Sequence, residues 1–118
     1  MILVDTSVWV DHLRRRNATL ATRLEAGEVV CHPFVVGELS LGSLKKRDQV
    51  LGLLSELPMA PVVPHDDVLS LVERRRLAGQ GIGWVDVHLI ASALLGRLDL
   101  WTLDRRLAVL ARTMDVSA

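Results

Sequence analysis

The chain has 118 residues, of which 50% are hydrophobic and 24% charged, and its 14 basic and 14 acidic residues give a formal net charge of zero. This composition excludes intrinsic disorder, and the length suits a single domain over residues 1–118. The single cysteine, Cys31, excludes an internal disulfide and a structural zinc site, so we expect a reducing compartment.

Apolar segments are too short to cross a membrane. The longest run without a formal charge covers ten residues, 87–96, whereas a spanning helix needs about 20 apolar residues. The opening residues show neither a basic stretch before an apolar run nor a small-residue cleavage site. We therefore expect no membrane segment, no secretion signal and a cytoplasmic location.

Strand and helix patterns alternate along the first half of the chain. Ile2–Val4 is a β-branched-rich run that predicts a strand, and Thr6 and Ser7 can cap a helix that extends through Leu13. A second short strand is expected over residues 29–31. Three further helices are predicted from apolar spacing, a glycine stop and helix-starting or helix-ending prolines: 18–26, 33–44 and 47–57.

The second half continues the alternation. Residues 60–63 are strand-like, but Pro61 and Pro64 cannot donate to a ladder, so this strand is expected at a sheet edge. Helices are predicted over 66–78, 85–95 and 104–112, with strands over 98–102 and, truncated, 114–116. Short apolar strands alternating with helices predict an α/β fold, in which helices cover both faces of a parallel sheet of about five strands.

Four carboxylates are isolated among apolar or small residues: Asp5, Glu38, Asp86 and Asp104. Each has an ordinary explanation, because aspartates cap helices or favour their first turns and a glutamate can face solvent on its helix. Asp5 and Asp104, however, both follow predicted parallel strands, and ligands bind at the carboxyl ends of such strands.

Carboxylates gathered in one pocket repel one another unless they are protonated or bind a hard divalent cation. No lysine is near any of the four in sequence, which favours Mg²⁺ or Mn²⁺. Oxygen ligands that leave positions for water and a phosphate support metal-assisted phosphodiester hydrolysis without a serine or cysteine nucleophile.

The neutral net charge conceals a basic surface. Without the four isolated carboxylates, ten acidic residues remain against 14 basic ones, a balance of +4. The basic residues cluster at 14–16, 45–47, 74–76 and 105–106, where they can contact phosphates or simply solubilise helix ends. The candidate RNA contacts are Arg14, Arg15, Lys45, Lys46 and Arg105.

Four segments resemble the landmarks of the PIN domain family: ILVDTSVW, VVGELSLG, WVDVHLIASAL and LWTLDRRL. They occur in the family's order and cover nearly the whole chain. The resemblance implies a three-layer PIN-like fold with strand order 3-2-1-4-5. It also matches the four carboxylates to the family's acidic quartet of catalytic metal ligands: Asp5, Glu38, Asp86 and Asp104. Thr6 and Thr102 are the expected supporting residues.

A PIN domain with nothing attached is similar to the VapC toxins of type II toxin-antitoxin systems. That similarity implies a Mg²⁺-dependent endoribonuclease acting on structured RNA. It also implies a cognate VapB-like antitoxin, a homodimer, and a heterotetramer or larger complex with the antitoxin. One departure is that Arg106 and Leu107 stand where many members carry a further acid and an aromatic residue. The alternative is a non-catalytic PIN-fold module that binds RNA or protein.

Overall fold

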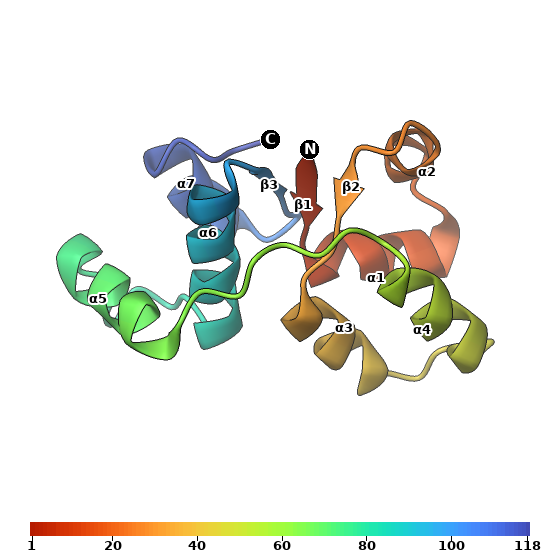
Figure 1. Ribbon diagram of the computed structural model, residues 1–118, viewed down its shortest axis with the longest axis horizontal. Helices are drawn as coiled ribbons and strands as arrows, with labels where there is room; N and C mark the ends of the chain where they lie inside the picture. Colours follow the sequence, from red (N-terminus) through yellow and green to blue (C-terminus); the bar gives the residue numbers. More distant parts are fainter.

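The structure is a computed structural model that describes residues 1–118 (Figure 1). Its strands are β1 (Ile2–Val4), β2 (Val29–Val30) and β3 (Asp99–Trp101). Its helices are α1 (Thr6–Arg15), α2 (Ala18–Glu25), α3 (Pro33–Ser40), α4 (Arg47–Ser55), α5 (His65–Arg75), α6 (Trp84–Gly96) and α7 (Arg105–Thr113). None of these helices has the length and apolar character needed to span a bilayer.

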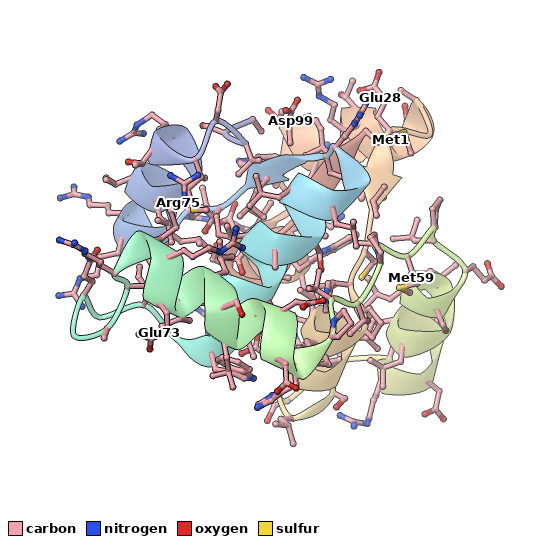
Figure 2. All side chains as sticks on the ribbon, turned by 60° about the vertical axis from the view of Figure 1, so that its left-hand side comes forward. Met1, Glu28, Met59, Glu73, Arg75 and Asp99 are labelled. Atoms are coloured by element: carbon pink, nitrogen blue, oxygen red, sulfur yellow. The ribbon has the colours of Figure 1, made fainter.

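The three strands form one parallel sheet in the order β2-β1-β3. Ile2 of the central strand is in register with Val29 on one side and Asp99 on the other. Figure 2 shows Met1, Glu28 and Asp99 together at the amino-terminal edge of this sheet. Because parallel strands need helical crossovers, the pairing confirms the α/β class.

The segment predicted as an edge strand over residues 60–63 does not form one. Cys31 and Met59 make an isolated parallel bridge beside β2, and the Ala60 N–H donates to the Cys31 carbonyl at 2.7 Å. The ladder stops there because Pro61 and Pro64 have no N–H to donate.

The truncated strand predicted over 114–116 is likewise a single bridge, between Leu100 and Ser117 beside β3. Three strands therefore stand where about five were expected. The five-strand count and the full order 3-2-1-4-5 are not confirmed, although both bridges are parallel and lie beside the outer strands.

Several predicted helices are shorter in the structure: those expected over 18–26 and 47–57 end at Glu25 and Ser55, and two others have a clear physical reason for their end. The helix expected over 33–44 ends at Ser40, ahead of Gly42 and Ser43, which are weak helix formers. The helix expected over 66–78 ends at Arg75, because Arg76 adopts a left-handed φ of 53° and the Leu77 N–H closes the turn on the Val72 carbonyl at 3.0 Å. Helix boundaries shift, but all seven helices were expected.

The core lies around the sheet and α6. Leu3 and Leu100, paired across β1 and β3, are buried, and α6 is buried continuously from Val87 to Ala93. In Figure 1 the strands lie centrally, with α5 to α7 on one side of the view and α1 to α4 on the other. α1 begins just after the carboxyl end of β1, and α7 begins shortly after the carboxyl end of β3.

Candidate active site

Two of the four isolated carboxylates follow neighbouring parallel strands. Asp5 comes directly after β1 and Asp104 comes shortly after β3. The Asp5 N–H donates to the carbonyl of Trp101, the last residue of β3, at 2.9 Å. Residues almost a hundred positions apart in sequence are thus brought to one edge of the sheet, opposite the edge marked by Met1 and Asp99.

Hydroxyl groups hold one oxygen of the buried Asp5 carboxylate. Its Oδ2 accepts from Ser7 Oγ and from Thr102 Oγ1, both at 2.7 Å, and more weakly from the Ser7 N–H at 3.3 Å. Ser7 Oγ also accepts from the Leu103 N–H at 2.9 Å, which connects the start of α1 to the segment after β3. The other oxygen of Asp5 makes no hydrogen bond, so it is available to a ligand.

Ser7 is a site residue that the sequence analysis missed. It was expected, with Thr6, to cap the helix, but Asp5 is the N-cap of α1 and Ser7 is a donor to it. The one available signal was the Asp-Thr-Ser order, which places a second hydroxyl two residues after the carboxylate. Thr102, in contrast, touches Asp5 as its predicted supporting role requires.

Glu38 is tied to α1 through the second predicted supporting residue. Thr6 Oγ1 donates to Glu38 Oε1 at 2.9 Å, although the two residues lie 32 positions apart. This bond joins α3 to the first residue of α1. Thr6 therefore orients the one carboxylate of the four that does not start a helix.

Asp104 and Asp86 serve as helix caps. Asp104 Oδ1 accepts from the Leu107 N–H at 3.0 Å at the start of α7, and Asp86 Oδ2 accepts from the Gly83 N–H at 3.4 Å at the start of α6. With Asp5, three of the four carboxylates cap helices. Capping and ligand binding are compatible, because a carboxylate has two oxygens and several lone pairs.

The four carboxylates interact electrostatically. Burial raises the pKa of Asp86, and the negative charges of Asp5, Asp104 and Glu38 raise it further against the opposing hydrogen bond from Gly83. The protein has two ion pairs, Arg15–Asp11 and Arg23–Glu28, and neither involves these groups. Their mutual repulsion is therefore not relieved by any cationic side chain.

The donor chemistry of this group fits a hard divalent cation. Carboxylate oxygens are the ligands that Mg²⁺ and Mn²⁺ prefer, and the group combines uncompensated negative charge with an oxygen of Asp5 that has no partner. As the side chains lie, no three Asp, Glu, His or Cys residues form a ready metal-binding cluster. The residue types fit the metal, while their present positions do not enclose a common point.

Two of the predicted RNA contacts share a cleft with the site. A cleft of about 390 Å³ between α1 and α3 is lined by Thr6 and Glu38 together with Arg14 and Lys45. The cleft therefore joins one carboxylate to two basic side chains. Lys46 does not line it and precedes α4 with a left-handed φ of 52°.

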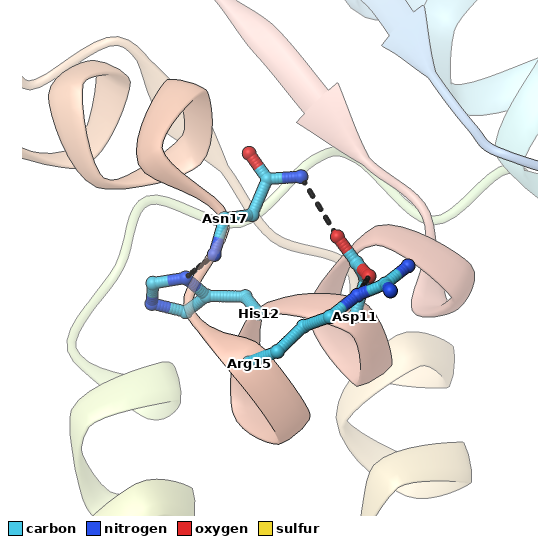
Figure 3. Close-up of polar contacts among 4 residues, drawn as sticks. All are labelled: Asp11, His12, Arg15 and Asn17. Carbon is cyan, nitrogen blue, oxygen red and sulfur yellow. Dashed lines mark hydrogen bonds and ion pairs between the residues drawn. The ribbon is translucent and has the colours of Figure 1, made fainter.

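Arg15 and Arg105 are placed differently. Figure 3 shows Asp11 accepting from Arg15 Nε at 2.7 Å and from Asn17 Nδ2 at 3.1 Å, while the Asn17 N–H donates to His12. The hydrogen bond from Arg15, and to a lesser extent the one from Asn17, holds the pKa of Asp11 below its ordinary value. Arg15 is thus engaged within the protein. Arg105 lines a separate cleft between α5 and α7.

Comparisons with other proteins identify the family of this chain. The family profile described as PIN domain matches residues 2–113. The chain is similar to the protein named Ribonuclease VapC32 of Mycobacterium tuberculosis (strain CDC 1551 / Oshkosh), with 57% identity over 108 residues that make up 91% of this chain and 87% of that protein. The protein of the same name from strain ATCC 25618 / H37Rv matches with the same values.

Proposed function

This chain belongs to the PIN domain family, and from that premise we propose that it is the toxin of a VapBC-type toxin-antitoxin system, acting as a Mg²⁺-dependent endoribonuclease. One observation carries the proposal: the negative charges of Asp5, Glu38 and Asp104 all act on the Asp86 carboxylate, and none of the four forms an ion pair with a cationic side chain. The similarity to a protein named as a ribonuclease supports the choice of RNA as substrate.

The four carboxylates would hold Mg²⁺ or Mn²⁺, which when bound supplies an activated water and neutralises charge on the phosphate. The protein's own contribution is orientation. Ser7 and Thr102 fix one oxygen of Asp5 and leave the other open, and Thr6 does the same for Glu38. Outer hydrogen bonds of this kind set the direction and basicity of metal ligands.

Structured RNA is the proposed substrate class. Arg14 and Lys45 line the cleft that contains Glu38, so they would contact phosphates next to the scissile one. Arg15, Lys46 and Arg105 remain proposed contacts of lesser weight, since none of them lines this cleft. We place the activity in the cytoplasm, where such RNA is made and used.

The proposed partner is a VapB-like antitoxin that covers an apolar groove. The groove, of about 460 Å³, lies between α1, α2 and α4, and most of its lining is apolar: Trp9, Leu13, Leu24, Val50, Leu53, Leu54 and Leu57. An amphipathic helix of the antitoxin fits this surface.

Homodimerisation is also proposed. Three large apolar side chains are exposed: Leu41 directly after α3, Leu69 on α5 and Trp84 at the start of α6. A second copy of the chain would cover such residues, and antitoxin binding would then give a heterotetramer or larger complex. Light scattering of the free and the antitoxin-bound protein measures both states.

The decisive experiment separates capping from catalysis at Asp104. Asp104→Asn keeps an oxygen for the Leu107 N–H but removes a ligand charge, so α7 should stay capped while cleavage falls by several powers of ten. Asp99→Asn, at the exposed amino end of β3, is the matched control and should cleave normally. Purified protein free of antitoxin is assayed on RNA with Mg²⁺ or Mn²⁺ and again with chelator.

The results distinguish the two candidate functions. Cleavage that needs the metal and is lost in Asp104→Asn supports the ribonuclease. A wild-type protein that binds RNA in Mg²⁺ and in Mn²⁺ without cutting it supports the non-catalytic module. Cleavage that continues undiminished in chelator contradicts the metal requirement.

A further inference from the structure

A second cleft lies between the C-terminal end of α5 and α7. It has a volume of about 480 Å³, within the range of about 300–1,000 Å³ that is usual for small-ligand sites. Arg75, Arg105 and Arg106 line it, and no acidic residue does. The rest of the lining is mainly apolar, with Leu77, Ile82, Val109, Leu110 and Met114, and includes the polar residues Gln80 and Thr113.

The three arginines are not neutralised within the protein. Neither of the two ion pairs includes any of them. In Figure 2 Arg75 lies beside α7, whereas Glu73 of the same helix points away from it. The cleft therefore offers positive charge next to an apolar surface.

Gly81 gives the Arg106 guanidinium its place. This glycine has φ of +75°, and a Cβ at that position would overlap Arg106 Nη1. The absence of a side chain lets the guanidinium lie against the backbone of the loop before α6. The Arg106 guanidinium is therefore close to the loop that leads to Asp86.

Two segments link this cleft in sequence to the carboxylate residues. Arg105 and Arg106 directly follow Asp104, and Ile82 comes four residues before Asp86. An RNA strand held at Asp104 would therefore be near Arg105 and Arg106. In Figure 1, α5 and α7 lie on one side of the strands, and α1 and α3, which form the cleft of Arg14 and Lys45, lie on the other.

We infer that this cleft binds one unpaired nucleotide of the RNA substrate, next to the scissile bond. Guanidinium groups bind phosphate in bidentate fashion, and an apolar surface accepts the face of a base that is not stacked in a helix. A nucleotide inside a duplex has both faces covered by the bases stacked on it. The inference rests on the proposed function and assigns to this cleft the contact with a nucleotide that flanks the cut.

The test uses a synthetic RNA hairpin that the wild-type protein cleaves, in three forms. One form leaves the flanking nucleotides of the cleavage site unpaired, the second pairs them, and the third replaces each flanking nucleotide in turn by an abasic one. Binding is measured by fluorescence anisotropy in chelator over a series of salt concentrations. Wild-type protein should bind the unpaired form about tenfold more tightly than the paired form. It should also bind the unpaired form about tenfold more tightly than one of the two abasic forms, the one that lacks the base held in the cleft.

Arg75→Gln and Arg106→Gln are the test variants, and Arg97→Gln, at the start of the segment before β3, is the matched control. Each test variant should bind about tenfold more weakly and lower the salt slope by about one, while Arg97→Gln binds as wild type does. Val109→Asn, on the apolar floor, should remove the preference for the intact over the abasic RNA. Circular dichroism checks that all four variants are folded.

Two results would overturn the inference. The first is that Arg75→Gln and Arg106→Gln bind RNA like Arg97→Gln. The second is that they keep RNA binding but lose association with the antitoxin or with a second copy of the chain, which would make the cleft a protein interface. Failure of the proposed function looks different, because in that case the wild-type protein cleaves no RNA in Mg²⁺ or Mn²⁺.

Discussion

His32 is a buried histidine with both ring nitrogens engaged. Nδ1 accepts the Phe34 N–H at 3.0 Å and caps α3, so the proton of the neutral ring is on Nε2, which lies 3.0 Å from Ser92 Oγ. Burial, and secondarily the nearby His88, lower the pKa of His32 from 6.5 to about 4. The helix that carries Glu38 thus starts at a histidine that stays neutral well below pH 6.5.

We predict that this histidine makes the protein sensitive to acid. Its folded-state pKa is below its unfolded value, so its contribution to stability is full above pH 6.5 and is lost as the pH falls toward about 4. The shift is equivalent to about 3 kcal/mol. Asn in place of His32 can still cap α3 but does not titrate. Urea unfolding at pH 7 and pH 4 should show a loss about 3 kcal/mol larger in wild type than in His32→Asn, and equal losses would contradict the assignment.

Ser7 is predicted to act through Asp5. Ser7→Ala removes one of the two hydroxyl donors to the carboxylate, and the loss of an outer hydrogen bond of this kind costs about 10- to 100-fold in metal affinity or activity. Ser7→Thr keeps the hydroxyl and should retain most of the metal affinity and activity of the wild type. Calorimetric titration with Mn²⁺ measures the affinity directly. The control is Ser117→Ala, in the C-terminal bridge far from the carboxylates. If Ser7→Ala binds Mn²⁺ as tightly as this control does, Ser7 does not act through Asp5.

Among the connecting elements, the loop before α6 carries two glycines with positive φ. Gly79 has φ of +74° and nothing near its missing Cβ, while Gly81 has φ of +75° and contacts Arg106. Alanine at either position should lower the free energy of unfolding by about 1 kcal/mol, because both adopt the left-handed region. Only Gly81→Ala should also weaken RNA binding, since it alone displaces the guanidinium. Equal RNA binding by the two variants would show that the Arg106 position does not matter.

Most elements could be predicted because their signals are local. Proline begins α3 at its first position, and Gly27, with φ of +69°, follows the end of α2. The segments expected as further strands, 60–63 and 114–116, were wrong, because a strand depends on hydrogen bonds to a neighbour that the sequence does not show. Beside β2, Pro61 and Pro64 interrupt those hydrogen bonds. The end of α3 was also misplaced, since the apolar residues beyond Ser40 continue the helical pattern.

Some residues of the candidate site could be predicted from the sequence, and others could not. The carboxylates could be found because charges in apolar segments are conspicuous, and Thr102 because it belongs to a family motif. Ser7 was missed because a serine after a strand is an ordinary capping residue. The cleft of Arg75 and Arg106 could not be predicted at all, since it depends on how α5 packs beside α7.

At the scale of the whole molecule, the apolar groove of α1, α2 and α4 predicts that antitoxin binding and RNA cleavage depend on different surfaces. Leu53 lines this groove and is 59% exposed, while Leu95 is 62% exposed and lies outside it. Leu53→Asp should abolish binding of the protein encoded by a neighbouring small open reading frame and leave RNA cleavage unchanged. Leu95→Asp should bind that protein normally. Pull-down and cleavage assays test both, and an unaltered complex with Leu53→Asp would exclude this groove.

The hydrogen bond between Asp5 and Thr102 spans 97 residues of sequence, and it affects the order of events during protein synthesis. A ribosome adds about 5–20 residues per second, so Asp5 waits roughly 5–20 seconds for its hydroxyl partner and for Asp104 to be translated. The central strand, β1, is made first and receives β3 as its second neighbour only near the end. If the chain acts on RNA as proposed, its carboxylate site is therefore complete only when translation is almost finished. A partner that is already present can bind the finished protein at that moment.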